Sequence, residues 1–230
     1  MRPLLLLALT LPLFARTAAA QPADPQPADP SVHVHDGFYF RIAAGFGAYS
    51  EGLRSESAAA YGGKVKGRSS GFATLGEFAL GGTIAKGLVL GGGAYTAQLV
   101  SGTYRTYRDS AGVPPPELDP EVRNFALVGP FFDWYPTPHK GFHLQAALGV
   151  ASLSGVQLDA FPVRDDEPYT AIGGGIMFGV GHEWWIGEQW SMGVLGRVMG
   201  AILMGKDDQD VRWYHAAGTS PSVLLTVTYH

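Results

Sequence analysis

The sequence predicts an all-β fold, an eight-stranded antiparallel up-and-down transmembrane β-barrel. Three observations lead to this class. Apolar residues alternate with small or polar ones through most of residues 37–230, which is the period of a strand that has two different environments. The predicted strands mostly span 11 to 17 residues, whereas strands of soluble proteins average about 5–6. Short and long connections alternate along the chain, as they do in barrels that cross a lipid bilayer.

The alternation is clearest in residues 123–152, which we interpret as two strands joined by a turn at 136–141. Two prolines and a glycine in this turn cannot continue a β-ladder. In the second strand one face is large and apolar and the other is small or polar. The apolar face carries Phe142, Leu144, Ala146, Leu148 and Val150. In a soluble sheet this face would meet a core, and in a membrane barrel it would meet acyl chains.

Six further segments complete the predicted set of strands. They are residues 37–49, 71–82, 87–100, 169–185, 190–204 and 220–230, and the two faces of 87–100 are left unassigned. Membrane-crossing strands need about 9–11 tilted residues, which these segments supply. The predicted connections at 84–86, 136–140 and 186–189 are short, and those at 50–70, 101–122, 154–168 and 205–219 are long and polar. An even number of strands puts both chain ends on the short-turn side, the periplasm.

The first 36 residues precede the barrel, which we expect to span 37–230. Residues 1–20 have the charged start, apolar core and small-residue end of a secretory signal peptide. Residues 21–36 begin with a duplicated QPADP and predict a disordered, Pro-rich linker. Removing Arg2 and Arg16 with the signal peptide takes the 16 basic residues to 14 against 20 acidic ones, a net charge of −6. This balance argues against nucleic acid as a partner. The chain has no cysteine, so it forms no disulfide.

Aromatic residues gather beside the short turns. An amphipathic ring at that place lies at the level of the lipid headgroups, so we expect a periplasmic-side aromatic girdle. The predicted girdle comprises Trp134, Tyr135, Phe142, Trp184, Trp185, Trp190 and Tyr229.

A second set of residues is polar and falls on the faces opposite the apolar ones. A charge in the lipid belt costs several kcal/mol, so these side chains are expected to point inward. Buried charges must then pair with each other. The predicted interior network comprises Arg41, Glu77, Asp133, His143, Gln145 and Arg197. We expect the two carboxylates, Glu77 and Asp133, to meet the two guanidinium groups. One interpretation is that this network only fills the barrel. The alternative is that it forms a path for protons or ions.

The sequence offers little for catalysis or metal binding. His33 and His35 share one face of an extended segment, but no third ligand lies nearby in sequence, so no metal site and no cofactor are predicted. Acidic residues of the long connections are candidates for catalytic groups or for ligands of divalent ions. They are Asp165, Asp166, Glu167, Asp207, Asp208 and Asp210, with His215 beside the last three. No spacing of nucleophile and base stands out, so no enzyme is predicted.

Two segments carry a family resemblance. GPFFDWYPTPHKGFHLQAALGVA (Gly129–Ala151) and GVGHEWWIGEQWSMGVLGRV (Gly179–Val198) resemble small outer-membrane barrels of Gram-negative bacteria, the OmpA/OmpW-like group. The resemblance implies an outer-membrane location, contact with lipid and lipopolysaccharide, and insertion by the barrel-assembly machinery. Such chains commonly end in an aromatic residue, whereas here Tyr229 precedes His230. We expect a non-enzymatic structural or surface-interaction role. The alternatives are a narrow, porin-like channel for small ions or hydrophobic solutes and a soluble periplasmic lipocalin-like binding barrel. The oligomeric state is not predicted.

Overall fold

Eight strands account for almost all of the structure that can be described. The computed structural model describes residues 34–35, 37–55, 65–108, 123–154, 170–206 and 212–230, which belong to one unit, His33–His230. The predicted signal peptide lies outside the described residues. The strands are β1 Phe38–Ser55, β2 Val65–Ala85, β3 Leu88–Arg108, β4 Arg123–Trp134, β5 Phe142–Ser154, β6 Thr170–Trp185, β7 Trp190–Lys206 and β8 Arg212–Tyr229.

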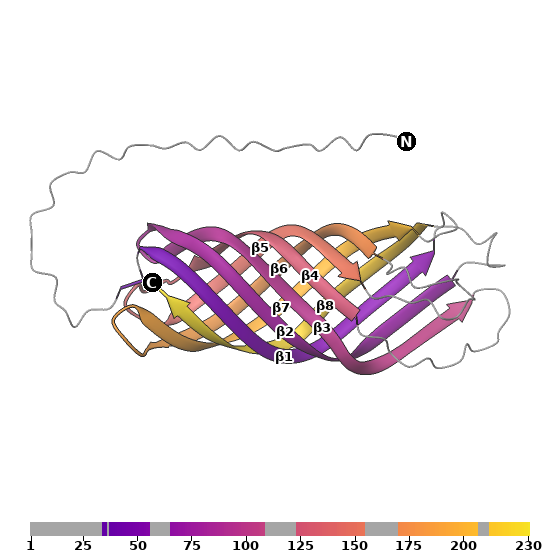
Figure 1. Ribbon diagram of the computed structural model, residues 1–230, viewed down its shortest axis with the longest axis horizontal. Helices are drawn as coiled ribbons and strands as arrows, with labels where there is room; N and C mark the ends of the chain where they lie inside the picture. The colour runs from indigo at the N-terminus through magenta and orange to yellow at the C-terminus, as the bar shows by residue number, and fades with distance from the viewer. Residues whose placement is uncertain (1–33, 36, 56–64, 109–122, 155–169, 207–211) are drawn as a thin grey trace, which may run out of the picture. The chain divides into compact units, whose positions relative to one another are not determined.

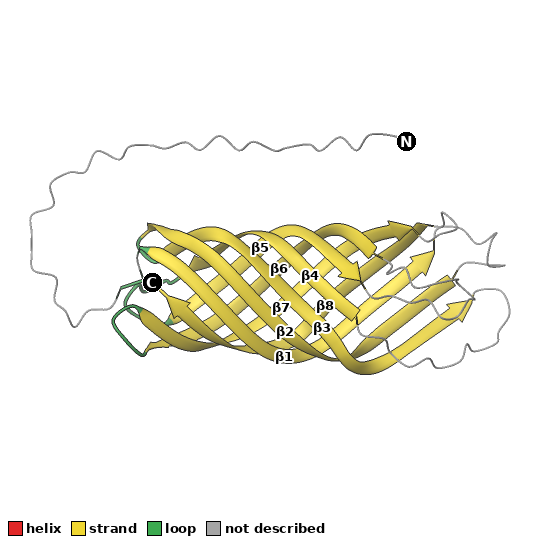
Figure 2. Ribbon diagram, in the orientation of Figure 1, coloured by secondary structure: helices red, strands yellow, loops and turns green. Residues whose placement is uncertain are grey.

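The strands follow one another around a closed barrel (Figure 1). Each strand pairs antiparallel with the next one in sequence, and β8 returns to β1, where Phe40 pairs with Tyr229. This confirms the predicted eight-stranded, up-and-down, all-β class. Figure 2 shows the short turns together at one end of the barrel, the end that also carries residue 230. We call this the short-turn end and the opposite one the long-connection end. None of the described residues belongs to a helix long and apolar enough to cross a membrane.

Several strands are longer than predicted and take up parts of the predicted connections. Strands β2 and β3 have 21 residues each, and β8 begins at Arg212 rather than at Ser220. The ladder continues through polar pairs such as Ser50 with Ser70 and Gly52 with Arg68. The outward residues there are polar because they lie beyond the apolar part of the wall. A pattern based on apolar alternation therefore ended these strands too early.

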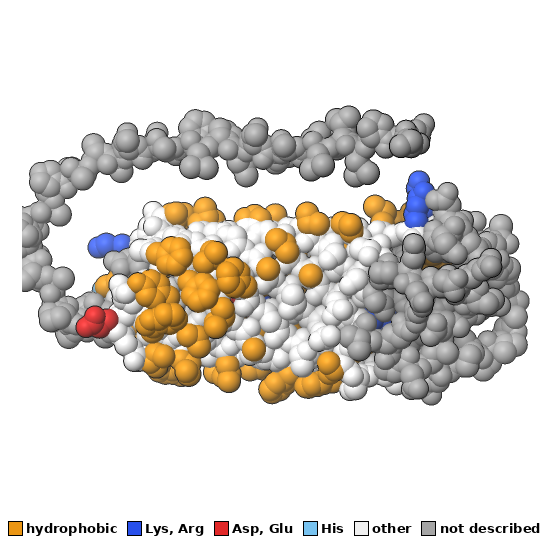
Figure 3. All heavy atoms as spheres, in the orientation of Figure 1, with side chains coloured by type: hydrophobic (Ala, Val, Ile, Leu, Met, Phe, Trp, Pro, Cys, Tyr) orange, Lys and Arg blue, Asp and Glu red, His pale blue; other side chains and the backbone are white. Residues whose placement is uncertain are grey.

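The outer wall of the barrel is apolar along its middle. Large apolar side chains point outward from every strand, among them Phe46, Phe72, Leu148, Ile202 and Leu225. In Figure 3 the apolar side chains of the visible wall gather most densely toward the short-turn end. On strand β3, whose faces were not assigned from sequence, Leu90 and Val100 point outward, whereas Tyr95 and Leu99 are buried. Among the described strand residues, the exposed Lys and Arg side chains are at the long-connection end. They are Arg54, Lys66, Arg68, Lys206 and Arg212.

Glycines inside the barrel have two different causes. Some make room for neighbouring side chains, as at Gly175, where an added Cβ would lie 3.0 Å from the side chains of Ala151 and Leu127. At Gly149 the added Cβ would instead meet the backbone of Val128 on the neighbouring strand, and Gly45, Gly47 and Gly173 also face neighbouring backbone. At those positions glycine permits two strongly coiled strands to approach closely.

Candidate functional site: the charged interior

The structure buries all six residues of the predicted interior network. Arg41 forms an ion pair with Asp133, with 2.8 Å between Nη2 and Oδ2. Arg197 forms another with Glu77, with 3.1 Å between Nη1 and Oε2. Gln145 donates to Glu77 at 2.7 Å, and His143 Nδ1 lies 2.7 Å from Asp133 Oδ1. The interior thus contains two ion pairs, Arg41–Asp133 and Arg197–Glu77, and each pair joins two strands that are not neighbours in the barrel.

Glu183 is the centre of the group at the short-turn end, and the predicted network did not include it. Its Oε1 accepts from Arg41 at 2.6 Å and from Thr228 at 2.7 Å. Its Oε2 accepts from Ser191 at 2.8 Å and from Tyr135 at 3.2 Å. Glu183 falls on the inward face of its strand by simple alternation, so the sequence contained the signal. The proximity of Arg41 follows only from closure of the barrel.

A third charged group lies at the long-connection end and was missed. Glu51 forms an ion pair with Arg123, and its Oε1 lies 2.7 Å from His215 Nδ1. All three side chains are buried. The sequence pattern places His215 in a long connection. This placement is wrong, because β8 begins before His215 and its ring is buried inside the barrel. Continuing the alternation of β1 past Tyr49 would have identified Glu51.

Apolar side chains separate the charged groups along the strands. On β4, Phe125, Leu127 and Phe131 lie between Arg123 and Asp133, and all three are buried. These residues belong to one buried apolar cluster with residues of the other strands, including Leu75, Leu99, Met177 and Met199. Along β4, apolar side chains therefore separate the charged group at the long-connection end from the one at the short-turn end.

The short-turn end is closed by His35, which precedes β1. Its ring stacks on Tyr135, with 3.8 Å between centroids, and on Trp185, with 4.9 Å. Its Nδ1 lies 3.1 Å from Nε2 of His230, and its backbone N–H donates to the carbonyl of Pro138 at 3.2 Å. Burial, followed by the neighbouring His230, lowers the pKa of His35 to about 3. His35 was predicted to belong to the disordered linker, and the structure corrects this, because the ring is fully buried.

The predicted aromatic girdle divides into two sets. Trp134, Phe142, Trp184 and Trp190 are exposed on the outer wall, and Tyr229 packs edge-on against Trp190. Tyr135 was wrongly placed in the girdle, because it alternates with Trp134 and its side chain is buried inside. Trp185 also contributes to the interior side, where it stacks on His35. The other candidates for catalysis or metal binding lie outside the described residues. They are His33, Asp165, Asp166, Glu167, Asp207, Asp208 and Asp210.

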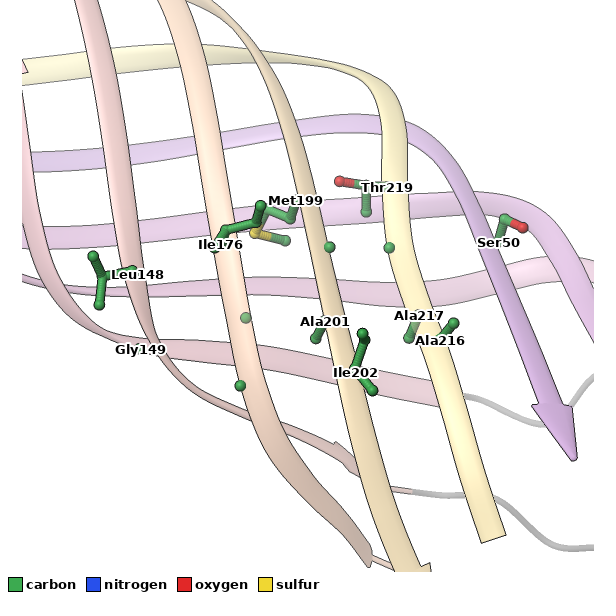
Figure 4. A pocket seen from close by; sticks show the side chains of 14 residues that line it. Ser50, Leu148, Gly149, Ile176, Met199, Ala201, Ile202, Ala216, Ala217 and Thr219 are labelled. Atoms are coloured by element: carbon green, nitrogen blue, oxygen red, sulfur yellow. The ribbon is translucent and has the colours of Figure 1, made fainter. Parts of the chain in front are cut away.

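A shallow hollow of about 900 Å³ interrupts the apolar wall over β5 to β8 (Figure 4). Its lining combines large apolar residues, Leu148, Ile176 and Ile202, with small ones such as Gly174 and Gly200. An added Cβ at either of these glycines would meet nothing within 4 Å. The lining of the hollow is mostly apolar.

No family model and no curated protein matches this chain. Among solved structures it is similar to the outer-membrane protein OprG from Pseudomonas aeruginosa, with 12% identity and a TM-score of 0.44, over 86% of this chain and 98% of that one. It is also similar to the outer-membrane protease OmpT from Escherichia coli, with 9% identity and a TM-score of 0.38, over 85% and 97%. A third is Ail of Yersinia pestis, solved with the heparin analogue sucrose octasulfate, with 10% identity and a TM-score of 0.33, over 84% and 98%. No inference about activity follows from similarity at this level.

Proposed function

We propose that this chain is an integral outer-membrane barrel with a plugged interior, which serves a structural or surface-interaction role rather than transport or catalysis. The observation that carries the proposal is the inversion of the two faces of the barrel wall. Arg41, Glu77, Asp133 and Arg197 are buried inside, whereas Phe46, Leu148 and Leu225 are exposed outside. A soluble barrel such as a lipocalin has the opposite arrangement, because water favours charged groups outside and apolar ones inside.

The plug follows from how the interior charges are neutralised. Arg197 and Glu77 pair directly, and so do Arg123 and Glu51. An eight-stranded barrel is just wide enough for its side chains to fill it. A hydrated ion crossing the barrel would have to break these pairs and displace the apolar cluster that lies between them. The narrow-channel alternative therefore requires a rearranged interior.

Conductance across planar bilayers tests the plug. We expect the purified full-length chain to give no single-channel steps, because the ion pairs and apolar side chains fill the lumen. A large-pore porin reconstituted in the same way provides the positive control for insertion. Steady conductance of the wild type that changes in Arg197→Ala would instead identify the interior as an ion path and would reject the plug.

Lipopolysaccharide is the surface partner that the cations at the long-connection end favour. Arg54 lies directly opposite Lys66 on paired strands β1 and β2, and Lys206 lies opposite Arg212 on β7 and β8. Like charges directly across a ladder repel each other and destabilise the sheet. A phosphate group between the two members of a pair removes this cost and adds charge-assisted hydrogen bonds. The Arg54–Lys66 pair is therefore well placed for a phosphate of the lipid headgroup.

Binding of purified lipopolysaccharide to the folded barrel tests this partner. We expect the double variant Arg54→Ser/Lys66→Ser to weaken binding by at least about tenfold, since one charge-assisted hydrogen bond alone contributes roughly 1.5–3 kcal/mol. Lys86→Ser is the matched control, because Lys86 is an exposed cation at the short-turn end. Equal binding by the double variant and the control would rule out the pair as a phosphate site.

A further inference from the structure

The short-turn end brings together a set of metal-ligating side chains that are remote in sequence. His35, Glu183 and His230 are all buried, and one potential ligand atom of each lies within 4.8 Å of the other two. His35 comes from the segment before β1, Glu183 from β6, and His230 follows β8. Two imidazoles and one carboxylate form a donor set that suits zinc and related transition-metal ions. Closure of the barrel thus brings Glu183 and His230, which are remote from His35 in sequence, close to its ring.

Two of the three distances between these ligand atoms match those of a tetrahedral ion, and the third is within 4.8 Å. Zinc binds nitrogen and carboxylate oxygen at about 2.0–2.2 Å, so the ligand atoms of a tetrahedral site lie roughly 3.3 Å apart. His35 Nδ1 lies 3.1 Å from His230 Nε2, and His230 Nε2 lies 3.3 Å from Glu183 Oε2. The hydroxyl of Ser191 lies 3.1 Å from His230 Nε2 and 2.8 Å from Glu183 Oε2, beside the same two ligands. A small movement of the rings would accommodate an ion.

The charges of this group provide an independent reason for a cation. The group contains the carboxylates of Asp133 and Glu183 and the guanidinium of Arg41, all buried, and His143 and His230 beside them are charged only when protonated. With neutral imidazoles, the form that binds metal, two negative charges face one positive charge, and an uncompensated buried charge is costly. A divalent ion bound beside Glu183 would supply positive charge where it is missing.

We propose that His35, Glu183 and His230 form a binding site for one divalent transition-metal ion of the zinc class, which fastens the segment before β1 to the short-turn end of the barrel. The ion would connect this segment to β6 and to the residue that follows β8. Neither the plugged interior nor the lipopolysaccharide partner is needed for this site.

Titration of the folded, metal-free full-length chain with Zn²⁺ in detergent micelles tests the proposal. We expect binding of one equivalent, and at least about 100-fold weaker binding for His35→Ala and for His230→Ala, because loss of even an outer-shell partner costs 10- to 100-fold. His182→Ala is the matched control. This histidine is exposed on β6, one residue from Glu183, and its ring faces Trp184 on the outer wall.

Two further measurements keep the test decisive. Heat-modifiable migration on gels shows whether each variant is folded, and His35 lies outside every strand, so its replacement removes no ladder contact. Co²⁺ in the wild type should give the intense visible bands of a tetrahedral site. The proposal is overturned if wild type binds no Zn²⁺, if both ligand variants bind as tightly as His182→Ala, or if Co²⁺ shows only the weak bands of an octahedral ion.

Discussion

At the scale of single residues, the interior is set by what each side chain can reach. His143 on β5 reaches Asp133 on the adjacent strand β4, and the room for its ring comes from Gly181 on β6, the strand on the other side. A Cβ added at Gly181 would overlap the imidazole of His143, whose Nδ1 lies 2.7 Å from Asp133. The lack of a side chain at Gly181 therefore allows the ring of His143 to lie beside Asp133.

The variant Gly181→Ala tests this relation. We expect it to lower the free energy of unfolding by about 1–3 kcal/mol, the usual cost of overpacking, because the ring must leave Asp133. Urea unfolding in detergent micelles measures the change. Gly174→Ala on the same strand is the control, since a Cβ there would meet nothing within 4 Å, and it should have little effect. Equal stabilities of the two variants would contradict the role of Gly181.

Residue-scale prediction from sequence succeeds where a single rule decides the outcome. Exclusion of charge from the lipid face leads to Arg41, Asp133, Glu77 and Arg197, and the structure contains an Arg41–Asp133 pair and an Arg197–Glu77 pair. The contacts of Glu183 with His230 depend on which strand ends meet when the barrel closes. The local sequence pattern does not show which strand ends meet, so the candidate metal ligands could not be grouped from sequence.

At the scale of strands, alternation predicts which residues share a face but not where the strand ends. Within the apolar wall, the period-two pattern placed Phe142, Leu148 and Val150 together, and all three are exposed on the outer wall. Beyond the wall both faces are polar or small, so the pattern disappears although the ladder continues. This explains why β8 was expected to begin at Ser220 and why His215 was placed in a connection.

The lipid contact of a strand can be tested with one outward charge. Leu225 on β8 has 67% of its surface exposed. If that surface meets acyl chains, Leu225→Arg should lower the free energy of unfolding from lipid vesicles by about 2–4 kcal/mol near the bilayer midplane. On a soluble protein the same exposed substitution would change stability by roughly 0.5 kcal/mol or less.

The control for this variant is Thr103→Arg, which places the same charge on an exposed residue of β3 near the long-connection end. We expect the control to unfold as the wild type does, because its side chain reaches the headgroups or water. A neutral Leu225→Arg would show that β8 does not face lipid.

At the scale of the whole molecule, the barrel has an apolar exterior, a charged interior and two different ends. The short-turn end is closed by His35 and the aromatic rings around it, and the long-connection end carries two like-charged pairs on its outer surface. The class of the fold followed from strand length and the order of short and long connections. The grouping of His35 with Glu183 and His230 depends on how the two ends of the barrel sheet meet, which the closed barrel determines.

Fractionation of Gram-negative cells that express the full-length chain, followed by a carbonate wash of the membranes, tests whether the apolar wall meets lipid. A protein whose exposed apolar residues cover every strand should remain in the outer-membrane pellet after the wash, and should migrate differently on gels before and after boiling. Recovery of a folded protein in the soluble fraction would contradict the membrane barrel, and would mean that another protein or a ligand covers this wall.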